Sequence, residues 1–390
     1  MQAKIQLNSI IPNHFCHVII FLTDKTILQN LFLLPLQKEY PMFKALQIKN
    51  FRGIKSAEIN GLAQINLFFG KNNCGKSTVL EALFLITGQS NPVLPISINS
   101  MRNYMRFSED DLNIEFYNLN PENTIFISAQ GDEDRWLEIS QIKSHSKTVN
   151  LESLTNGLSD SAAKNYGLKL NYSIGKKDNK YSSEFILKEG DPDNGKVSVD
   201  KRYKESLFSQ YITSSSQQTS LNDEFARIVA NKQESHILTA LREIDPSIND
   251  IQLVGNEILV DIGAEQRLPI NMTGDGLRKI LMIIISIYRC RNGILLIDEI
   301  DNGFHFSAME VLWKAILTTA RDNNVQLFAS THNIDSLKGL NNVLDEAAYS
   351  SYQKKVSAFK LLKDKNGKVT GLRYDYPSFQ YSINQELEMR

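Results

Sequence analysis

Hydrophobic runs and short polar turns alternate along most of the chain, and one strand, turn and helix pattern stands out at residues 65–88. Residues 65–69 form a short apolar and aromatic run of the kind found in buried strands. A glycine-rich turn follows at once. Apolar residues then recur at helical spacing up to Gly88, which can cap a helix C-terminus. The pattern therefore predicts a strand, a glycine loop and a helix in direct succession.

Alternating and uniformly apolar segments elsewhere predict a mixture of strands and helices. The predicted strands around the glycine loop are 43–49, 51–54, 57–59, 114–116, 124–128 and 136–139. Hairpins are predicted where apolar runs flank a polar turn, at 168–187, 251–262 and 358–374. The remaining predicted segments are an irregular 89–110, a polar insertion at 140–165 and a mostly helical 200–245.

Two later segments have the sequence of strands that are buried on both faces, yet each ends in polar residues. Residues 293–297 run into Asp298 and Glu299, and residues 325–329 run into a polar triplet that closes with His332. Two acids at the end of a buried strand are costly unless they have a cation or a proton to handle. These strand ends are therefore candidates for a chemical site.

A helix is predicted between these two strands, beginning at Ser307. Ser307 and Glu310 have the spacing of a capping box, and an apolar helical pattern follows them. A strand, a helix and a second parallel strand form a right-handed crossover, which places both strand ends on the same side of a sheet. We therefore expect Asp298, Glu299 and His332 to lie near one edge.

Composition places the chain among ordinary soluble globular proteins. Of its 390 residues 42% are hydrophobic and 22% are charged, which is enough for two or three domains. The net charge of −1 gives no overall sign of a nucleic-acid partner. The three cysteines, Cys16, Cys74 and Cys290, are odd in number and scattered. They argue against a disulfide framework or a cysteine-based zinc site, and they favour the cytoplasm.

The first 41 residues fit this picture less well. Two apolar runs, 15–22 and 27–34, are separated by a polar tetrapeptide, so neither reaches the roughly 18 residues that a membrane span needs. A signal peptide is weakly supported, because only Lys4 precedes the first run and no typical cleavage site follows. We favour a third interpretation, in which Met42 is the natural start and residues 1–41 are an extension.

The glycine loop has the chemistry of a phosphate-binding site. Gly70 and Gly75 permit backbone conformations in which successive N–H groups point at phosphate oxygens, and the following helix adds the positive end of its dipole. Lys76 supplies a mobile charge and Ser77 a hydroxyl for Mg²⁺. The residues predicted to bind nucleotide span the loop: Gly70, Lys71, Asn72, Asn73, Cys74, Gly75, Lys76, Ser77 and Thr78. Cys74 is interpreted as a small filler, with an oxidation switch as the alternative.

A nucleotide-hydrolysing site also needs groups for the metal and for water. Asp298 is predicted to bind Mg²⁺ together with Ser77. Glu299 is predicted to polarise the attacking water as a general base. His332 is predicted to contact the γ-phosphate from the neighbouring strand.

A second anion site is predicted at Thr273 and Gly274. There a Gly-x-Gly turn precedes an apolar helix at 277–288, so another positive helix end is available. A protein that works alone needs one such site for each nucleotide. Two sites suggest that two copies of the chain share each nucleotide, and a plain helix cap without ligand is the alternative.

In this order, the elements resemble those of the ABC-type ATPases of the SMC and OLD-like group, a group with many bacterial proteins of anti-phage defence and DNA repair. Residues 43–54 look like the family's opening strand, 70–78 like its Walker A motif and 295–299 like its Walker B motif. Asp301 and His332 stand where the family has its D-loop and H-loop. The resemblance covers roughly residues 42–340.

The family's signature motif is matched more loosely, by residues 272–276. Asp275 replaces the motif's second glycine and Gly276 its glutamine, so Thr273 would make the serine's contact. The resemblance implies that Thr273 and Gly274 contact the nucleotide of a partner copy, and that Arg52 binds the nucleotide. Gln130 is a weak candidate for the glutamine-loop residue.

The resemblance implies an α/β fold, a P-loop NTPase with an ABC/SMC-type head that joins a mixed β lobe to a parallel-sheet lobe and carries a short helical insertion. The expected segments are an extension (1–41), a first ATPase lobe (42–140), an inserted hairpin and helical arm (141–250), a second ATPase lobe (251–345) and a hairpin tail (346–390). Only about fifty residues follow His332, and their acids are scattered, so no nuclease domain is expected in this chain.

The function implied is Mg²⁺-dependent hydrolysis of ATP by a cytoplasmic homodimer or higher oligomer. Closure and opening of the dimer would gate a separate effector chain, for example a nuclease, in DNA repair or anti-phage defence. DNA remains an open partner and no membrane partner is expected. The alternative function is a nucleotide-stabilised oligomeric scaffold in which hydrolysis is incidental.

Overall fold

A computed structural model describes residues 3–6, 42–104, 108–143, 165–175, 179–188, 191–213 and 221–385. Most of the predicted N-terminal extension and most of the predicted polar insertion at 140–165 lie outside these residues. Within the described part of the chain, no helix is long and apolar enough to cross a membrane.

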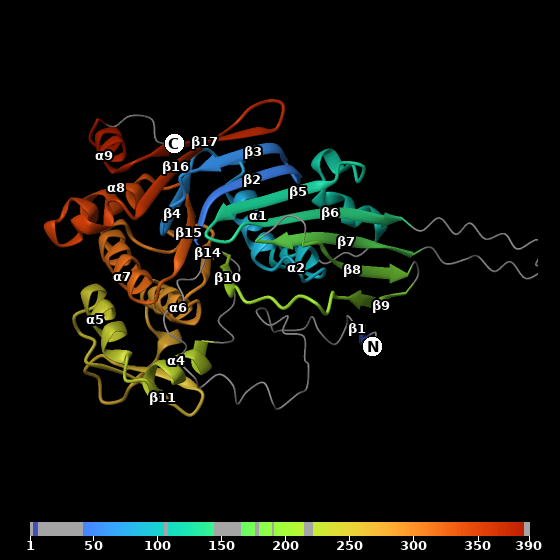
Figure 1. Cartoon of the computed structure of the whole chain (residues 1–390). Coiled ribbons are helices and arrows are strands. Elements are labelled where there is room, and N and C mark those ends of the chain that lie inside the picture. The colour runs from blue at the N-terminus through green and yellow to red at the C-terminus, as the bar shows by residue number, and fades with distance from the viewer. Residues whose placement is uncertain are drawn as a thin grey trace, which may run out of the picture.

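One mixed sheet runs through the molecule (Figure 1). Its strands, in spatial order, are β1 (Ala3–Gln6), β9 (Asp191–Ser198), β8 (Tyr181–Lys188), β7 (Asn165–Ile174), β6 (Arg135–Lys143), β5 (Ile125–Gly131), β2 (Phe43–Phe51), β3 (Ile54–Asn60), β17 (Lys368–Tyr374), β16 (Val356–Lys363), β4 (Ile65–Phe69), β15 (Gln326–Thr331), β14 (Ile294–Ile297) and β10 (Ser209–Ile212). All four predicted segments from residue 42 onward contribute strands to this sheet. The division into lobes stays a prediction.

The two halves of the sheet differ in direction and in burial. Strands β16, β4, β15, β14 and β10 pair in parallel, and every residue of β4, β14 and β15 is buried. The strands from β9 to β3 pair antiparallel, and in β3 buried and accessible residues alternate. A parallel sheet covered on both faces and an antiparallel sheet open on one face explain the two patterns. The predicted mixed and parallel parts are thus confirmed.

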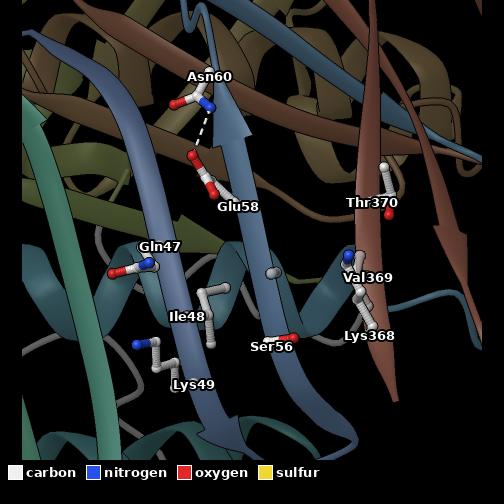
Figure 2. A pocket seen from close by; sticks show the side chains of 10 residues that line it. Gln47, Ile48, Lys49, Ser56, Glu58, Asn60, Lys368, Val369 and Thr370 are labelled. Carbon is white, nitrogen blue, oxygen red and sulfur yellow. Dashed lines mark hydrogen bonds between the residues drawn. The ribbon is translucent and has the colours of Figure 1, made fainter. Parts of the chain in front are cut away.

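The open face of the antiparallel half is polar. A hollow of about 380 Å³ lies on it, over β2, β3 and β17, and Figure 2 shows the side chains that line it. Gln47, Glu58 and Thr370 line the hollow, and the amide of Asn60 donates a hydrogen bond of 2.9 Å to the Glu58 carboxylate. None of the predicted site residues lines it.

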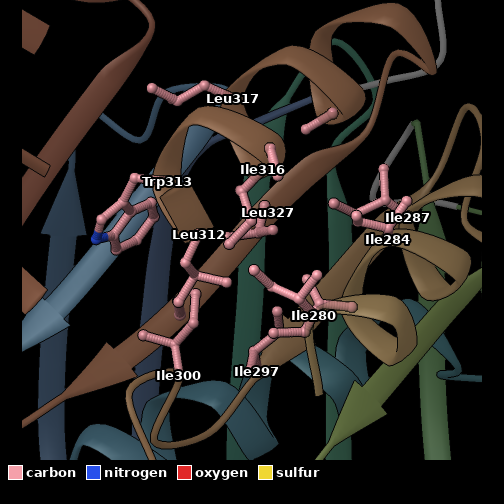
Figure 3. Packing of buried hydrophobic residues seen from close by; sticks show 14 of the residues in the cluster. Ile280, Ile284, Ile287, Ile297, Ile300, Leu312, Trp313, Ile316, Leu317 and Leu327 are labelled. Atoms are coloured by element: carbon pink, nitrogen blue, oxygen red, sulfur yellow. The ribbon is translucent and has the colours of Figure 1, made fainter. Parts of the chain in front are cut away.

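Helices cover both faces of the parallel half. Helix α1 (Lys76–Thr87) buries its apolar side in one core, and α6 (Asp275–Arg289), α7 (Met309–Asp322) and α8 (Ile334–Asp345) bury theirs in the other. Strand β4 serves both cores, because Phe68 faces α1 while Leu67 and Phe69 face the opposite side. Figure 3 shows how Ile280 and Leu312 meet the strand residue Leu327 in the second core.

A smaller unit packs on α6. It consists of α4 (Leu221–Ala230), α5 (Glu234–Ile244) and a separate sheet of β11 (Asp250–Val254), β12 (Glu257–Asp261) and β13 (Leu268–Pro269). At the other end of the helical layer, α9 (Tyr376–Asn384) packs on α8. Every predicted hairpin is confirmed, as β7 with β8, β11 with β12 and β16 with β17.

Several local predictions are wrong. The segment 89–110 contains α2 (Leu94–Met101), because Pro95 stands in the first helical turn, where its missing N–H costs nothing. The predicted strand 114–116 is mostly a 3-10 turn (Asn113–Glu115) that continues α3 (Glu109–Leu112), and only Phe116 forms a bridge, to Phe51. A capping box at Ser108 and Asp111 starts α3. The predicted helical region 200–245 opens with strand β10 before its helices.

The predicted capping box of α7 is also wrong. Helix α7 begins at Met309, and its N-cap residue Ala308 has no side-chain hydrogen bond. A 3-10 turn at Phe306–Ala308 precedes it, and the Ser307 hydroxyl lies 2.9 Å from the His305 imidazole instead. The local turn therefore takes the serine that the pattern assigned to the helix.

Candidate functional site

The phosphate loop joins β4 to α1, as the sequence predicts, and its two glycines have backbone angles that other residues avoid. Gly70 has φ 139° and Gly75 has φ 103°. A Cβ on Gly70 would also lie 2.7 Å from the Leu361 carbonyl oxygen. Glycine is therefore required there both for conformation and for the close approach of β16.

Lys76 is buried inside the loop, with 9% of its surface exposed. Its amine donates hydrogen bonds to the carbonyl oxygens of Gly70 (2.8 Å) and Lys71 (3.1 Å). The loop thus holds the amine at its centre through backbone acceptors. A charged donor in this position suits a phosphate oxygen.

The other loop residues divide between an outer and an inner surface. The side chains of Lys71, Asn72 and Asn73 are exposed, whereas that of Cys74 is buried. Burial raises the pKa of the Cys74 thiol, although the nearby Lys76 amine opposes this. A thiol held in its neutral form is less reactive, which favours the interpretation of Cys74 as a small filler. Ser77 and Thr78 lie in the first turn of α1.

The parallel strands bring three predicted groups to one edge of the sheet. In the β4–β15 ladder Phe69 pairs with Thr331, and in the β15–β14 ladder Ala329 pairs with Ile297. The residues that follow these pairs therefore leave the sheet side by side. They are the phosphate loop, His332 and the acids Asp298 and Glu299.

Asp298 is held in place by two hydroxyl groups. Ser330 Oγ on the neighbouring strand donates a hydrogen bond to its Oδ1, and the Tyr211 hydroxyl on β10 lies 3.5 Å from its Oδ2. Burial, with the Asp298 carboxylate as a further cause, raises the pKa of Tyr211 well above its ordinary value, so that the phenol stays a donor.

The oxygen donors at this edge fit Mg²⁺. Mg²⁺ usually binds one or two carboxylates and takes its other ligands from phosphates and water. Asp298 and Ser77 offer one carboxylate and one hydroxyl. Among the residues described here, no cluster of three or more His, Cys, Asp or Glu side chains could hold a metal ion. A Mg²⁺ ion at this edge would therefore need ligands from phosphates and water.

Glu299 follows in a left-handed backbone conformation, with φ 54°. Its N–H donates to Ser330 Oγ (2.9 Å), and the next N–H, of Ile300, donates to the Ser330 carbonyl (3.0 Å). These bonds stabilise a conformation that costs on the order of 1 kcal/mol or more in a non-glycine residue. The Glu299 carboxylate lies 3.9 Å from His332 Nδ1, and both side chains are about half exposed, at 41% and 50%.

Asp301, placed at the D-loop by sequence, is buried and bonds within the chain. Its Oδ1 accepts a hydrogen bond of 2.5 Å from the hydroxyl of Thr331. This bond ties the segment after β14 to the end of β15, two residues beyond Glu299. Asp301 therefore positions the strand ends.

Thr273 and Gly274 lie in an exposed turn at the N-terminus of α6. Gly274 is the N-cap residue, and the Thr273 hydroxyl donates to the Ile270 carbonyl (2.7 Å). Within the described part of the chain no hydrogen bond joins this turn to the phosphate loop. The neighbouring Met272 is 76% exposed, so the turn is presented to the outside.

Arg52 belongs to a buried cluster beside α1. Its guanidinium donates to Asn99 Oδ1 (2.7 Å) and lies 3.3 Å from Glu81 and 3.5 Å from Glu115. Burial is the main cause that raises the pKa of Glu115, against the attraction of Arg52. The guanidinium is thus engaged by protein groups, and its predicted contact with nucleotide stays a prediction. Gln130 lies exposed on β5.

Sequence reasoning missed several residues that shape this edge: Ser330, Tyr211, Glu81 and Arg102. Glu81 carried a local signal, because it follows Ser77 by four residues and so shares its face of α1. It pairs with Arg102 at 2.5 Å. Ser330 stands two residues before the predicted His332. Tyr211 had no local signal, since β10 was expected to be helical.

Three kinds of comparison with known proteins bear on this geometry. Residues 65–337 match the family model described as "AAA domain, putative AbiEii toxin, Type IV TA system". The chain is 24% identical to a protein named ATP/GTP phosphatase from Helicobacter pylori, over 80% of this chain and 91% of that protein. It is 34% identical to the DNA replication and repair protein RecF of Acinetobacter baumannii, over 17% of each chain.

Solved structures of SMC heads align over most of the chain. An SMC head bound to the winged-helix domain of ScpA covers 86% of this chain and 99% of its own, with 11% identity and a TM-score of 0.49. The Smc head domain with an extended coiled coil from Pyrococcus furiosus covers 89% of this chain and 99% of its own, with 9% identity and a TM-score of 0.47.

Proposed function

Because this chain belongs to the AAA domain family that its residues 65–337 match, and is thus an ATPase, we propose that it hydrolyses ATP with Mg²⁺ at the edge where β4, β14 and β15 end. The observation that carries the proposal is the convergence of the phosphate loop, Asp298 and the Glu299–His332 pair on this edge. The name of the Helicobacter pylori relative supports the same reaction.

Each group has a distinct part in the proposal. Lys76 and the loop N–H groups bind the β- and γ-phosphates. Asp298, fixed by Ser330, and Ser77 would hold Mg²⁺, which would supply positive charge to the phosphates. Glu299 orients and deprotonates the attacking water. His332, 3.9 Å from Glu299, contacts the γ-phosphate.

A homodimer is the second part of the proposal. The exposed turn at Thr273 and Gly274 adds a helix N-terminus that a nucleotide on a second copy can reach. Closure of the dimer on ATP would then gate a separate effector in the cytoplasm. The family description, which mentions a toxin and is matched by residues 65–337, supports an effector partner. The RecF match supports a DNA context, but it covers only 17% of the chain.

Substitution of the base tests the reaction. Glu299→Gln removes the base but keeps the shape of the side chain, so the turnover number is expected to fall by at least about a hundredfold. ATP binding should persist, because Lys76 and Asp298 are unchanged. Steady-state hydrolysis and equilibrium binding of ATP measure the two quantities. Hydrolysis at the parent rate would contradict the assignment of Glu299.

Mixing of variants tests the shared site. Gly274→Asp should fold, since a Cβ at Gly274 meets no atom within 4 Å and aspartate is a good N-cap, yet its charge repels phosphate. Lys76→Ala and Gly274→Asp should each be inactive alone and regain activity when mixed, because one site then has an intact loop and an intact turn. A mixture of Lys76→Ala with Glu299→Gln is the control and should stay inactive.

The outcome also separates the ATPase dimer from a nucleotide-stabilised scaffold. A scaffold with incidental hydrolysis would show no regain in the first mixture, because each copy would work with its own groups. It would still change its oligomeric state with ATP. Light scattering of each mixture, with and without Mg·ATP, provides that second measurement.

A further inference from the structure

Two arginines hold a buried glutamate on α1, one helical turn after Ser77. The Glu81 side chain is 1% exposed and accepts a hydrogen bond of 2.5 Å from Arg102 Nε, at the C-terminal end of α2. Arg52 lies 3.3 Å from the other carboxylate oxygen. The Arg52 side chain is 11% exposed, whereas that of Arg102 is 46% exposed. Of the two arginines, Arg102 is therefore the one that a ligand can reach.

Glu81 lies on the side of α1 that faces the proposed Mg²⁺ ligand Asp298. Ser77, Glu81 and Phe84 follow one another at spacings of four and three residues, so they share one face of the helix. The Phe84 ring packs on the Tyr211 ring of β10, with 5.6 Å between the centroids, and the Tyr211 hydroxyl lies 3.5 Å from Asp298. The partner of Glu81 therefore also lies toward β10 and β14.

The charges around Glu81 leave an excess of positive charge on this side. Burial is the main cause that raises the pKa of Glu115, which favours the neutral form of this second acid. Arg52 and Arg102 then share the carboxylate of Glu81. Against the effect of burial, Glu81 and Asp298 raise the pKa of Arg102, so the Asp298 carboxylate also lies near this guanidinium. An accessible cation near a Mg²⁺ ligand is well placed for a phosphate on the same metal.

The guanidinium of Arg102 has donors to spare. It has five N–H groups in one plane, and only Nε is used on Glu81. No residue in the described part of the chain accepts a hydrogen bond from its two terminal nitrogens. Arg52 differs, because a terminal nitrogen already donates to Asn99. The same arginine can thus be held by Glu81 and bind an anion with its other end.

We propose that Arg102 is a catalytic residue whose guanidinium binds the γ-phosphate, and that Glu81 positions it. This inference rests on the proposed function, because the loop and Asp298 fix where the γ-phosphate lies. In the reaction the bond from the γ-phosphorus to the β–γ bridging oxygen breaks and that oxygen leaves with ADP. A bond to the oxygen of water forms, and Glu299 takes the proton. Arg102 keeps its own proton and stabilises the negative charge on the γ-phosphoryl oxygens.

The test is the preference for ATP over ADP, because only ATP has a γ-phosphate. Arg102→Gln is made in the full chain that also carries Glu299→Gln, so that ATP is not consumed. Loss of a charge-assisted hydrogen bond should weaken ATP binding at least about tenfold, while ADP affinity stays within about twofold. Calorimetric titration with each Mg·nucleotide measures both. With Glu299 intact, Arg102→Gln should lower the turnover number by about a hundredfold or more.

Glu81→Gln tests the positioning role. It keeps the size of the side chain and leaves the Arg102 charge in place, so the preference for ATP should fall by only about threefold. In a chain that already carries Arg102→Gln, Glu81→Gln should lower the preference no further, because Glu81 acts through Arg102. A further loss in that chain would mean that Glu81 does not act by positioning Arg102.

Arg321→Gln is the matched control. The Arg321 side chain has nearly the same exposure as that of Arg102, 45% against 46%, and it also pairs with an acid, Asp322, at 2.7 Å. It lies near the end of α7, which precedes β15, and so at the opposite end of that strand from His332. Its variant should keep the parent's preference for ATP and the parent's turnover number.

Other results overturn the inference and can be told apart. If Arg102→Gln weakens ATP and ADP equally, or changes neither, Arg102 only pairs with Glu81, and the ATPase proposal still stands. If Arg102→Gln does not fold, Arg102→Lys takes its place, because it keeps a cation on Glu81 and removes the terminal guanidinium nitrogens. Its preference for ATP and its turnover number should also fall, and parent values would contradict the proposal. If the Glu299→Gln chain binds neither nucleotide, the proposed function fails, and this inference fails with it.

Discussion

The two ends of α1, the helix that follows the phosphate loop, differ in whether the protein supplies hydrogen-bond partners for the free backbone groups of the helix. At its C-terminal end the fully buried Arg135 donates to the carbonyl oxygens of Ile86 (3.5 Å) and Thr87 (3.3 Å). The same guanidinium makes two hydrogen bonds to Glu205, at 2.9 and 3.0 Å. At the N-terminal end Gly75 provides no side-chain cap, and no acidic residue stands in the first turn.

This difference separates stability from binding within one helix. Helix carbonyls at a C-terminus attract a cation, and here the protein supplies a permanent one. Helix N–H groups at an N-terminus attract an anion, and the chain supplies none, so that end is available to a phosphate. Substitution at one end should therefore affect folding, and substitution at the other should affect nucleotide binding.

The largest expected effect is at the C-terminal end of α1, the closed end, where Arg135 bonds to the helix carbonyls. Arg135→Met should lower the free energy of unfolding by about 3–5 kcal/mol, because Glu205 and the helix carbonyls lose a buried partner. Chemical denaturation measures the loss. The ATP affinity of the folded variant should stay within about threefold of the parent, since the loop is untouched; a collapse of affinity without a loss of stability would end the comparison.

A surface pair supplies the control for Arg135. Lys44, near the start of β2, and Asp132, just after β5, form an ion pair in the same sheet, with side chains 66% and 45% exposed. Lys44→Met also removes one positive charge, but exposed pairs contribute only about 0.2–1 kcal/mol. If both variants lose the same stability, burial of Arg135 has no special role.

At the N-terminal end of α1, the open end that has no side-chain cap, the expected effect is on ATP binding. Lys76→Ala should weaken ATP binding by at least about a hundredfold, or about 2.7 kcal/mol, because no other buried amine reaches the loop centre among the described residues. Calorimetric titration measures it. Lys201→Ala, which removes an exposed charge outside the loop, should change affinity by about threefold or less.

Sequence alone predicted the open end well. The apolar run 65–69, two glycines and a helical repeat are short-range signals, and they became β4, the loop and α1. The strands before Asp298 and His332 were equally clear, because uniformly apolar runs of that length fit a sheet that is covered on both faces.

The C-terminal end of α1, where Arg135 bonds to the helix carbonyls, and the place of β16 beside β4 could not be predicted. Arg135 and Glu205 are 70 residues apart and meet through strand pairing that no local pattern encodes. The same holds for β16, which lies beside β4 although Val356 pairs with Ile65 across nearly three hundred residues of sequence. Even a local element, α2, was missed because Pro95 suggested an irregular segment. These predictions failed because long-range strand pairing leaves no local pattern, and because proline can either break a helix or stand in its first turn.

The smallest expected effect concerns Glu115, a buried acid in the cluster beside α1. Glu115 is buried against Arg52 and Asn99, and burial raises its pKa above the ordinary value of 4.5. A raised pKa favours the protonated form in the folded state, so its contribution to stability is complete below about pH 4.5 and is lost as the pH rises through the folded-state pKa.

Glu115→Gln resembles the protonated form. The variant should therefore match the parent in stability at acid pH and exceed it at pH 7, by less than the change at Arg135. Denaturation at several pH values measures the difference, and a variant that is less stable than the parent at pH 7 would mean that Arg52 outweighs burial.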